Sequence, residues 1–143
     1  MAGGIVHRAT CVAIDGRAVL LEGPPGTGKS SLALQLIDRG AVLVGDDAVT
    51  LEACGVELIA APPPNIAGRI EIRNVGIATL PTSTAPVALR LLLGPDAPRH
   101  VERAETGELC AVPLPTLQFD PAIPGAAVRV EHALRLHGLT GLA

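Results

Sequence analysis

Aromatic side chains are almost absent from this sequence of 143 residues, which has one Phe and no Tyr or Trp. Proteins that bind single-stranded nucleic acid usually stack the bases on aromatic rings, and this chain lacks such rings. It also lacks a basic surplus, because its formal net charge is −3. The composition therefore gives no reason to expect a nucleic-acid partner.

Long apolar runs and paired cysteines are absent as well. No stretch approaches the ~20 uninterrupted apolar residues of a membrane-spanning helix, so we expect no membrane partner. Charged residues within the first 17 positions interrupt any signal peptide. The cysteines number three and lack the spacing of a metal or redox site. They are typical of reduced thiols in a cytoplasmic protein.

The chain does contain enough apolar residues to form a hydrophobic core. Apolar residues make up 48% of the chain, and the mean hydropathy is +0.44. A chain of this length is large enough to bury such a core. We expect residues 1–143 to form one folded domain.

A glycine-rich stretch at residues 23–30, GPPGTGKS, fills every fixed position of the pattern G-x-x-x-x-G-K-[ST]. An apolar run precedes it and a helical pattern at 29–39 follows, so a bound anion would lie at a helix N-terminus. In this motif the lysine reaches the β/γ-phosphates and the serine hydroxyl binds Mg²⁺. A glycine-proline turn is the alternative. The predicted nucleotide-binding residues are Gly23, Pro24, Pro25, Gly26, Thr27, Gly28, Lys29, Ser30 and Ser31.

The residues before the loop predict a hairpin. Residues 5–14 form an apolar, β-branched run, Asp15-Gly16 is a turn signal, and residues 18–22 return toward the loop. Such a hairpin makes the sheet mixed and brings His7 near the loop. A single histidine is more often a surface or core residue than a catalytic one, and both interpretations stay open on geometry alone.

Two acidic residues follow the next predicted strand. Residues 41–45 (AVLVG) are typical of a central buried strand, and Asp46 and Asp47 come directly after it. In a parallel arrangement this end of the strand lies at the same sheet edge as the loop. One carboxylate could hold a metal while the other accepts a proton from an attacking hydroxyl. A helix cap or a turn is the alternative.

The remaining pattern predicts shorter elements. Periodicity places Glu71 and Arg73 on one face of a strand, where such a pair is usually a solvated surface pair. The predicted elements are a hairpin at 48–60 turning at Cys54-Gly55, strands at 68–76 and 87–93, a polar loop at 94–108, a strand around Val128 and Val130, and a helix at 131–137 closed by Gly138.

Several stretches taken together resemble one family, the bacterial HPr kinase/phosphorylases. These are serine kinases that act on HPr, the phosphocarrier protein of the sugar phosphotransferase system. The resemblance covers almost the whole chain. The matching pieces are His7, GPPGTGKS, Asp38-Arg39-Gly40, LVGDD at 43–47, AAPPP at 60–64, IEIRNVGIATL at 70–80 with Asn74 where glycine is usual, and Arg103-x-x-x-Gly107-Glu108.

The resemblance implies a fold and a set of partners. The implied fold is α/β, with a P-loop-containing mixed β-sheet core like the nucleotide-binding core of phosphoenolpyruvate carboxykinase. The implied cofactors are ATP and Mg²⁺, the protein substrate is HPr, and the assembly is a homo-oligomer, commonly a hexamer. The region after Pro121 lacks the basic residues of the family's phosphorolysis segment. The reverse reaction, removal of phosphate from phosphoserine, therefore stays open.

The resemblance also implies a role for each matching residue. Lys29 and the loop amides would hold the β/γ-phosphates, and the Mg²⁺ ligands would be Ser30 and Glu71. Asp47 would be the base that takes the proton from the substrate serine, with Asp46 supporting the site. The remaining catalytic residues implied are His7, beside the transferred phosphoryl group, and Arg103, as a charge near it.

Two other functions are compatible with the same loop. One is a P-loop kinase of a small metabolite, for which the 94–108 segment with Arg99 and Arg103 would be the lid. The other is a non-catalytic nucleotide-binding module or a mechanical ATPase, because remodelling ATPases share the loop sequence. Phosphorylation of a carrier protein, compared with phosphorylation of a panel of metabolites, would separate the protein serine kinase from the metabolite kinase.

Overall fold

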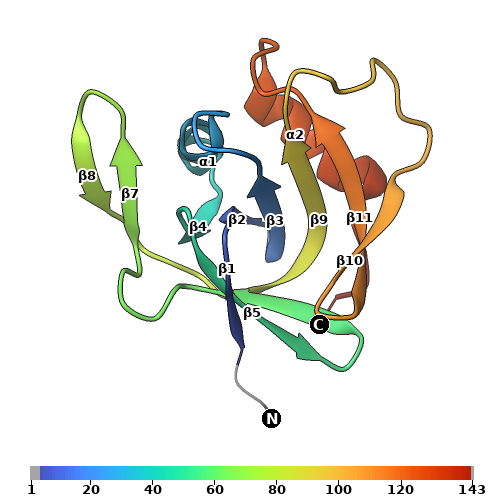
Figure 1. Ribbon diagram of the computed structural model, residues 1–143, viewed down its shortest axis with the longest axis horizontal. Helices are drawn as coiled ribbons and strands as arrows, with labels where there is room; N and C mark the ends of the chain where they lie inside the picture. The colour runs from blue at the N-terminus through green and yellow to red at the C-terminus, as the bar shows by residue number, and fades with distance from the viewer. Residues whose placement is uncertain (1–3, 143) are drawn as a thin grey trace.

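The computed structural model describes residues 4–142 and shows a mixed α/β fold with a curled sheet (Figure 1). The strands are β1 (Ile5–His7), β2 (Thr10–Ile14), β3 (Arg17–Glu22), β4 (Val42–Gly45), β5 (Val49–Cys54), β6 (Glu57–Ala61), β7 (Arg69–Ile72), β8 (Gly76–Thr79), β9 (Ala85–Leu93), β10 (Glu105–Leu109) and β11 (Val112–Phe119). The helices are α1 (Lys29–Asp38) and α2 (Ala126–His137). Within the described range neither helix is long and apolar enough to cross a membrane.

The sheet branches at β9. Along the main path the strand order is β1-β5-β6-β9-β3-β2-β4, while β11 pairs with β9 and β10 pairs with β11. Strand β9 is parallel to both β3 and β11 and antiparallel to β6. The carboxyl ends of β3, β9 and β11 therefore share one edge of the sheet. Open α/β sheets bind ligands at such an edge.

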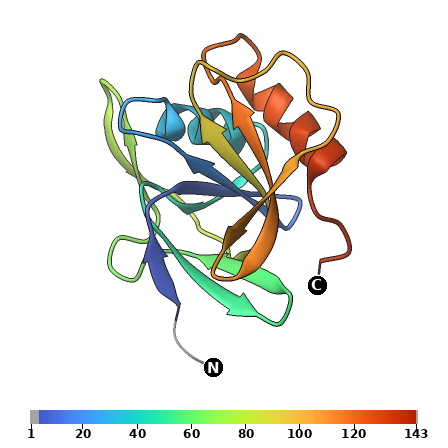
Figure 2. The same cartoon turned by 45° about the vertical axis from the view of Figure 1, so that its right-hand side comes forward.

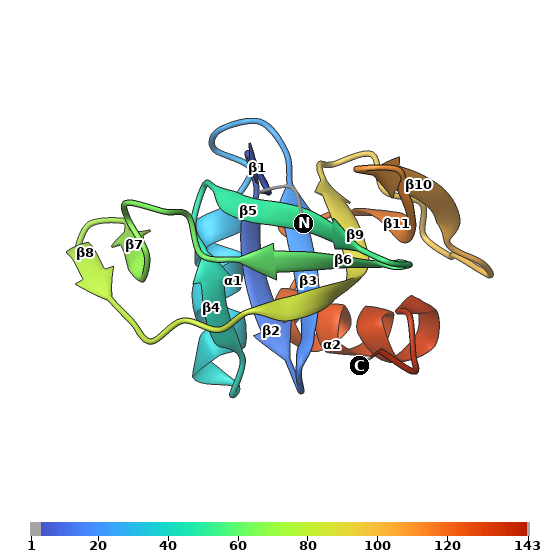
Figure 3. The ribbon, with the colours of Figure 1, turned by 90° about the horizontal axis from the view of Figure 1, so that it is seen from below.

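Strand β3, which leads into the glycine-rich loop, is anchored in two hydrophobic clusters. Val19 and Leu21 belong to the cluster under the helices, whereas Ala18 and Leu20 face the cluster beneath β5 and β6. Figures 2 and 3 show the helices on one side of the central strands and the β5–β6 hairpin crossing the other. All four side chains are fully buried. Burying a leucine contributes about 1.5–3 kcal/mol, so the start of the loop has a fixed position.

Helix α1 confirms the helix predicted after the loop. Leu32, Ala33 and Leu36 are its buried residues, at helical spacing. Its N-cap Gly28 has a φ of 94°, a conformation that L side chains rarely adopt. Gly40 follows the helix with a φ of 111°, as expected for a residue that ends one.

The prediction of a single strand over residues 5–14 was wrong. The chain breaks at Arg8, because β1 pairs with β5 while β2 turns back along β3. The Asp15-Gly16 turn between β2 and β3 is confirmed, with φ angles of 50° and 79°. The hairpin therefore exists, but its first arm is shorter than predicted.

The prediction of a central strand at 41–45 was also wrong. Strand β4 is at the end of the strand order and pairs antiparallel with β2, which separates it from β3. Val42 is accordingly 38% exposed. Because β2 is antiparallel to both neighbours, β3 and β4 still run in the same direction. Asp46 and Asp47 therefore still follow the β4 end that lies on the same side as the loop.

Three hairpins differ from the predicted segments. The first turn falls at Gly55-Val56, one residue later than predicted, because Cys54 pairs with Glu57. Residues 68–76 belong to a two-stranded hairpin, β7–β8, rather than to one strand. Residues 105–109 of the predicted polar loop form β10, whose exposed and half-buried side chains give no apolar alternation.

The prediction of a strand around Val128 and Val130 was wrong, since both residues lie in α2. The buried side chains of this helix are Ala126, Ala127, Val130 and Leu134, which recur with a helical period. The predicted helix at 131–137 is its second half. Gly138 is the C-cap residue, as predicted.

Candidate functional site

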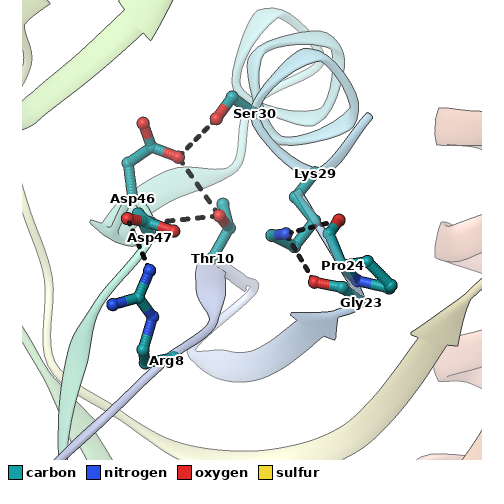
Figure 4. A network of polar contacts seen from close by, with 8 residues as sticks. All are labelled: Arg8, Thr10, Gly23, Pro24, Lys29, Ser30, Asp46 and Asp47. Carbon is teal, nitrogen blue, oxygen red and sulfur yellow. Dashed lines mark hydrogen bonds and ion pairs between the residues drawn. The ribbon is translucent and has the colours of Figure 1, made fainter. Parts of the chain in front are cut away.

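The glycine-rich loop connects the end of β3 to the start of α1. Gly23 has a φ of 157°, and a Cβ at this position would lie 2.9 Å from the Thr27 hydroxyl oxygen. The Lys29 Nζ donates hydrogen bonds to the carbonyl oxygens of Gly23 (2.7 Å) and Pro24 (3.1 Å). The lysine thus bends back over the loop, as Figure 4 shows. Its ammonium lies at the exposed mouth of the loop.

Asp46 joins four elements through its carboxylate. Its Oδ1 accepts hydrogen bonds from the Ser30 hydroxyl (2.6 Å) and the Thr10 hydroxyl (3.1 Å). Its Oδ2 accepts one from the backbone N–H of Glu71 (3.3 Å). These donors come from α1, β2 and β7, while Asp46 itself follows β4. Figure 4 shows the contacts of Asp46 with Ser30 and Thr10. Asp46 therefore holds the start of α1 against the sheet edge.

Asp47 is held by its backbone and leaves its carboxylate exposed. Its N–H donates to the Thr10 hydroxyl oxygen at 3.1 Å, and its φ is 66°. The side chain is 68% exposed and has Arg8 Nη2 at 3.6 Å from Oδ2. An ion pair this open to solvent contributes little energy. The two acids thus differ: Asp46 is tied into the frame, while Asp47 is free to meet a ligand.

One cavity of about 600 Å³ is lined by nine of the predicted site residues, among them Lys29, Ser30, Asp46, Asp47 and Glu71. The loop forms one wall and the β7–β8 hairpin forms the opposite wall. The hairpin contributes Glu71, Arg69, Arg73 and Ile77. The cavity therefore combines cationic groups, carboxylates and a helix N-terminus, an arrangement suited to a phosphate ester.

His7 lies at the base of the loop rather than in this cavity. Its Nε2 is 2.9 Å from Oε2 of Glu22, the residue that immediately precedes the loop. Glu22 in turn accepts two hydrogen bonds from Arg90 of β9, at 3.0 and 2.9 Å. The predicted closeness of His7 to the loop is confirmed by this contact, although His7 lies in β1, which pairs with β5 and is not part of the β2–β3 hairpin.

Arg103 is placed elsewhere. It lines two other cavities, with Glu102, beside the β10–β11 hairpin. Among the residues that line the cavity around Lys29, no side chain from the 94–104 segment occurs. A single chain in this conformation does not bring Arg103 to the predicted site.

Sequence reasoning missed three residues of this region. Thr10 gave no signal, because a threonine in an apolar strand is ordinary. Glu22 and Arg90 did give one: each is the only charged residue of its predicted strand, at 18–22 and 87–93 respectively. Such charges are seldom buried unless paired, so they could have been matched to each other.

The donor set fits a magnesium ion bound together with a polyphosphate. The Ser30 hydroxyl and the carboxylates of Asp46 and Glu71 line the same cavity, and each offers an oxygen ligand of the kind that Mg²⁺ prefers. Mg²⁺ usually takes only one or two carboxylates and completes its shell with water and phosphate oxygens. Within residues 4–142 no group of three or more His, Cys, Asp and Glu side chains could hold a metal ion. The site is therefore suited to a metal that arrives with its phosphates.

A glycine-rich loop at a shared strand edge, with paired acids beside it, is typical of α/β nucleotide-binding proteins. Residues 1–83 match the family described as HPr Serine kinase C-terminal domain. The chain therefore belongs to this family. Its likeness to known members extends beyond the matched segment, to most of the chain.

Two curated relatives are the HPr kinase/phosphorylases of Cupriavidus pinatubonensis and Burkholderia cenocepacia. Each is 34% identical over 122 residues, which is 84% of this chain and 38% of the relative. The chain thus spans 38% of the length of these relatives. The solved structure of the Hpr(Ser) kinase/phosphatase from Coxiella burnetii matches with a TM-score of 0.80 and 27% identity, covering 92% of this chain and 88% of that one. The mixed α/β fold with its curled sheet is therefore that of an HPr kinase.

Proposed function

We propose that this protein is an ATP-dependent kinase that transfers a phosphoryl group to a serine hydroxyl of the phosphocarrier protein HPr. Family membership supports the reaction class, and the names of the relatives support the substrate. The observation that carries the proposal is the single cavity of about 600 Å³ that contains Lys29, Ser30, Asp46 and Asp47. Phosphoryl transfer depends mainly on positioning and on neutralising charge, and these residues supply both.

The loop residues would bind the donor nucleotide. Lys29 would exchange the carbonyl oxygens of Gly23 and Pro24 for the β/γ-phosphate oxygens, and the loop N–H groups would surround the phosphates. Ser30 and Glu71 would hold Mg²⁺, which when bound neutralises phosphate charge. Asp46, already bonded to the Ser30 hydroxyl, would orient it.

Asp47 would be the general base. Its carboxylate is exposed in the cavity, whereas the carboxylate of Asp46 already accepts three hydrogen bonds. An incoming serine hydroxyl can therefore reach Asp47 and transfer its proton to it. A base has to lie within hydrogen-bond reach of the proton that it takes.

His7 would act beside the transferred phosphoryl group, positioned by Glu22 at the base of the loop. Arg103 would act there only after it moves to the cavity or is supplied by a second copy of the chain. The second possibility agrees with the proposed homo-oligomer. Sedimentation of the protein with and without Mg-ATP would measure the assembly.

The test is incubation with Mg-ATP and HPr, followed by mass spectrometry for phosphoserine. Lys29→Ala should lose nucleotide binding and transfer, while Asp47→Asn should bind ATP and transfer at least about a hundredfold more slowly, the usual range for a lost general base. Asp96→Asn, an exposed acid outside the cavity, is the matched control. Normal transfer by Asp47→Asn would reject the base assignment, and phosphorylation of a metabolite but not of HPr would reject the substrate. Adding phosphate to phosphoserine-HPr tests the reverse reaction.

A further inference from the structure

A second, smaller groove lies on the other side of the glycine-rich loop. Its volume is about 250 Å³, and it shares Gly26, Gly28 and Ser31 with the main cavity. Its far wall is formed by Pro121 and Ala122, in the segment between β11 and α2. A ligand could therefore extend from one cavity into the other across the loop.

The topology explains why this wall stands beside the loop. Strands β3, β9 and β11 are parallel, so residues 23–28 and residues 120–125 both follow carboxyl ends at the same sheet edge. The two loops are neighbours: a Cβ added to Gly28 would lie 3.9 Å from Cγ of Pro121, an ordinary van der Waals distance. The groove is thus the space between two loops that the sheet places side by side.

Arg129 of α2 fixes the wall. Its guanidinium donates hydrogen bonds to the carbonyl oxygen of Asp120, at 3.1 and 3.2 Å, and to that of Ile123 at 3.1 Å. The same guanidinium lies over the ring of Phe119, 4.4 Å from its centroid. The segment that carries Pro121 and Ala122 is therefore anchored at both of its ends. These contacts therefore fix the shape of the groove.

The lining of the groove is uncharged. Its polar side chains are Thr27, Ser31 and Gln35, and the others are apolar or glycine. The main cavity, by contrast, carries Lys29 and the two acids. This division matches the two halves of a nucleotide: the charged phosphates suit the main cavity, and the uncharged nucleoside suits the groove. The volume is also just below the ~300–1,000 Å³ of sites for drug-sized ligands, as a fragment of a nucleotide requires.

We propose that this groove binds the base and ribose of the donor nucleotide, and that it discriminates only weakly between adenine and guanine. The proposal rests on the proposed function, because it needs the phosphates to occupy the glycine-rich loop. Base selection requires fixed hydrogen-bonding groups that the wrong base leaves unpaired. The groove offers one side-chain amide, that of Gln35, which lies exposed on α1.

The amide of Gln35 suits both purines. An amide has a carbonyl oxygen that accepts and an NH₂ that donates, and it can turn to present either group. Adenine and guanine present opposite donor and acceptor patterns at their Watson–Crick edges. Rotation of the Gln35 amide therefore lets it form hydrogen bonds with either base. The single aromatic ring of the chain, Phe119, is 6% exposed beneath Arg129 and does not line the groove. We expect affinities for Mg-ATP and Mg-GTP within about tenfold of each other.

Calorimetric titration with three probes tests the proposal: Mg-tripolyphosphate, Mg-ATP and Mg-GTP. Ala122→Phe narrows the groove and should weaken both nucleotides about tenfold or more, while tripolyphosphate binding stays within about twofold. Gln35→Ala should weaken both nucleotides by less, and about equally. The matched controls are Ala53→Phe, an exposed alanine of β5, and Gln118→Ala, an exposed glutamine of β11. Both should leave all three affinities unchanged.

The outcomes separate the two proposals. Equal losses for tripolyphosphate and nucleotides in Ala122→Phe, or no loss for either, would overturn the nucleoside groove while leaving the loop assignment in place. A preference for one purine of more than about a hundredfold would overturn weak discrimination. If tripolyphosphate fails to bind the wild type, or binds Lys29→Ala equally well, the proposed function fails, and the groove proposal fails with it.

Discussion

The hydroxyl of Thr10 donates to Asp46 and accepts from the backbone N–H of Asp47, and the residue is fully buried. One uncharged side chain thus sets the position of both acids. Asp47 has a positive φ of 66°, which is uncommon for a residue other than glycine and is held here by that hydrogen bond. The difference between the two acids, one tied and one exposed, therefore depends on Thr10.

Thr10→Val keeps the shape of the side chain and removes the hydroxyl. We expect a loss of about 1–3 kcal/mol in the free energy of unfolding, because the Asp47 N–H and one Asp46 lone pair lose their partner. We expect transfer to HPr to fall more than ATP binding does, since Asp47 loses its position while Lys29 does not. Urea unfolding and the two activity assays measure these effects. Thr10→Ser keeps the hydroxyl and is the control; equal behaviour of the two variants would contradict the role.

Glu22 is a second residue that makes more polar contacts than its position in the sequence indicates. It accepts from Arg90 through two hydrogen bonds and lies 2.9 Å from His7, and only 13% of its side chain is exposed. Glu22→Gln should cost about 1.5–3 kcal/mol of unfolding free energy, the usual range for hydrogen bonds to a charged group. Glu108→Gln, an exposed acid of β10, should cost almost nothing. Thermal unfolding measures the melting temperatures of both variants. Equal melting temperatures for Glu22→Gln and Glu108→Gln would show that the ion pair of Glu22 does not stabilise the fold.

Among the described elements, the β7–β8 hairpin forms a two-stranded sheet of its own and pairs with no strand of the main sheet. Ile70 is its buried anchor, at 1% exposure, and packs in the cluster that contains α1 residues. The hairpin nevertheless forms one wall of the cavity around Lys29. A change in the conformation of its turn should therefore displace this wall of the cavity.

Asn74, in that turn, has a φ of 68°, in the left-handed region that glycine adopts most readily. Asparagine is among the side chains that tolerate the left-handed region best, whereas β-branched residues do not. Asn74→Val should destabilise the hairpin by about 1–2 kcal/mol, while Asn74→Gly should stay within about 0.5 kcal/mol of wild type. Hydrogen exchange of the amides of residues 69–79 measures this locally.

Asn65→Val is the control for that comparison, because Asn65 is also exposed and is outside the set of residues with positive φ. Faster exchange in both valine variants would mean that added hydrophobicity, and not backbone strain, opens the hairpin. Slower exchange in Asn74→Val would contradict the assigned conformation.

The elements also show what local pattern can and cannot predict. Helix α1 was predictable because its period, its preceding loop and Gly40 all agree. The break at Arg8 was not, because it is caused by strand pairing with β5, which lies 40 or more positions along the chain. Strand β10 was missed because its partner β11 and not its own apolar alternation determines it. Val128 and Val130 satisfied a strand period by chance within a helix.

At the scale of the whole molecule, the site was predictable as far as strand direction determines it. Lys29, Ser30, Asp46 and Asp47 meet because β3 and β4 run in the same direction, although β2 lies between them. Glu71 was implied by resemblance and reaches the cavity on a hairpin whose packing no local pattern reveals. Arg103 shows the limit: a residue can match a family motif and still lie at another surface of the single chain.

The two helices cover the same face of the sheet, and an ion pair joins them. Arg39, at the end of α1, donates to both carboxylate oxygens of Glu131 in α2, at 3.0 and 2.9 Å. The hydrogen bond from Arg39 lowers the pKa of Glu131 below its usual 4.5. A carboxyl group whose pKa is lower in the folded state stabilises that state above its unfolded pKa, and the contribution is lost as the pH falls through the folded pKa.

The melting temperature of wild type should therefore exceed that of Glu131→Gln at neutral pH, and the difference should shrink below pH 4.5, the usual pKa of this carboxyl group. Arg39 is 46% exposed and Glu131 20%, so the difference should be small and should also decrease in high salt. Scans from about pH 7 to about pH 3 measure it, with Glu102→Gln, an exposed acid away from α1, as the control. A difference that is constant across this range would mean that the bridge acts through packing of the two side chains and not through their charges. The contact between α1, which follows the glycine-rich loop, and α2, which contains Arg129, would then contribute the same stability across this pH range.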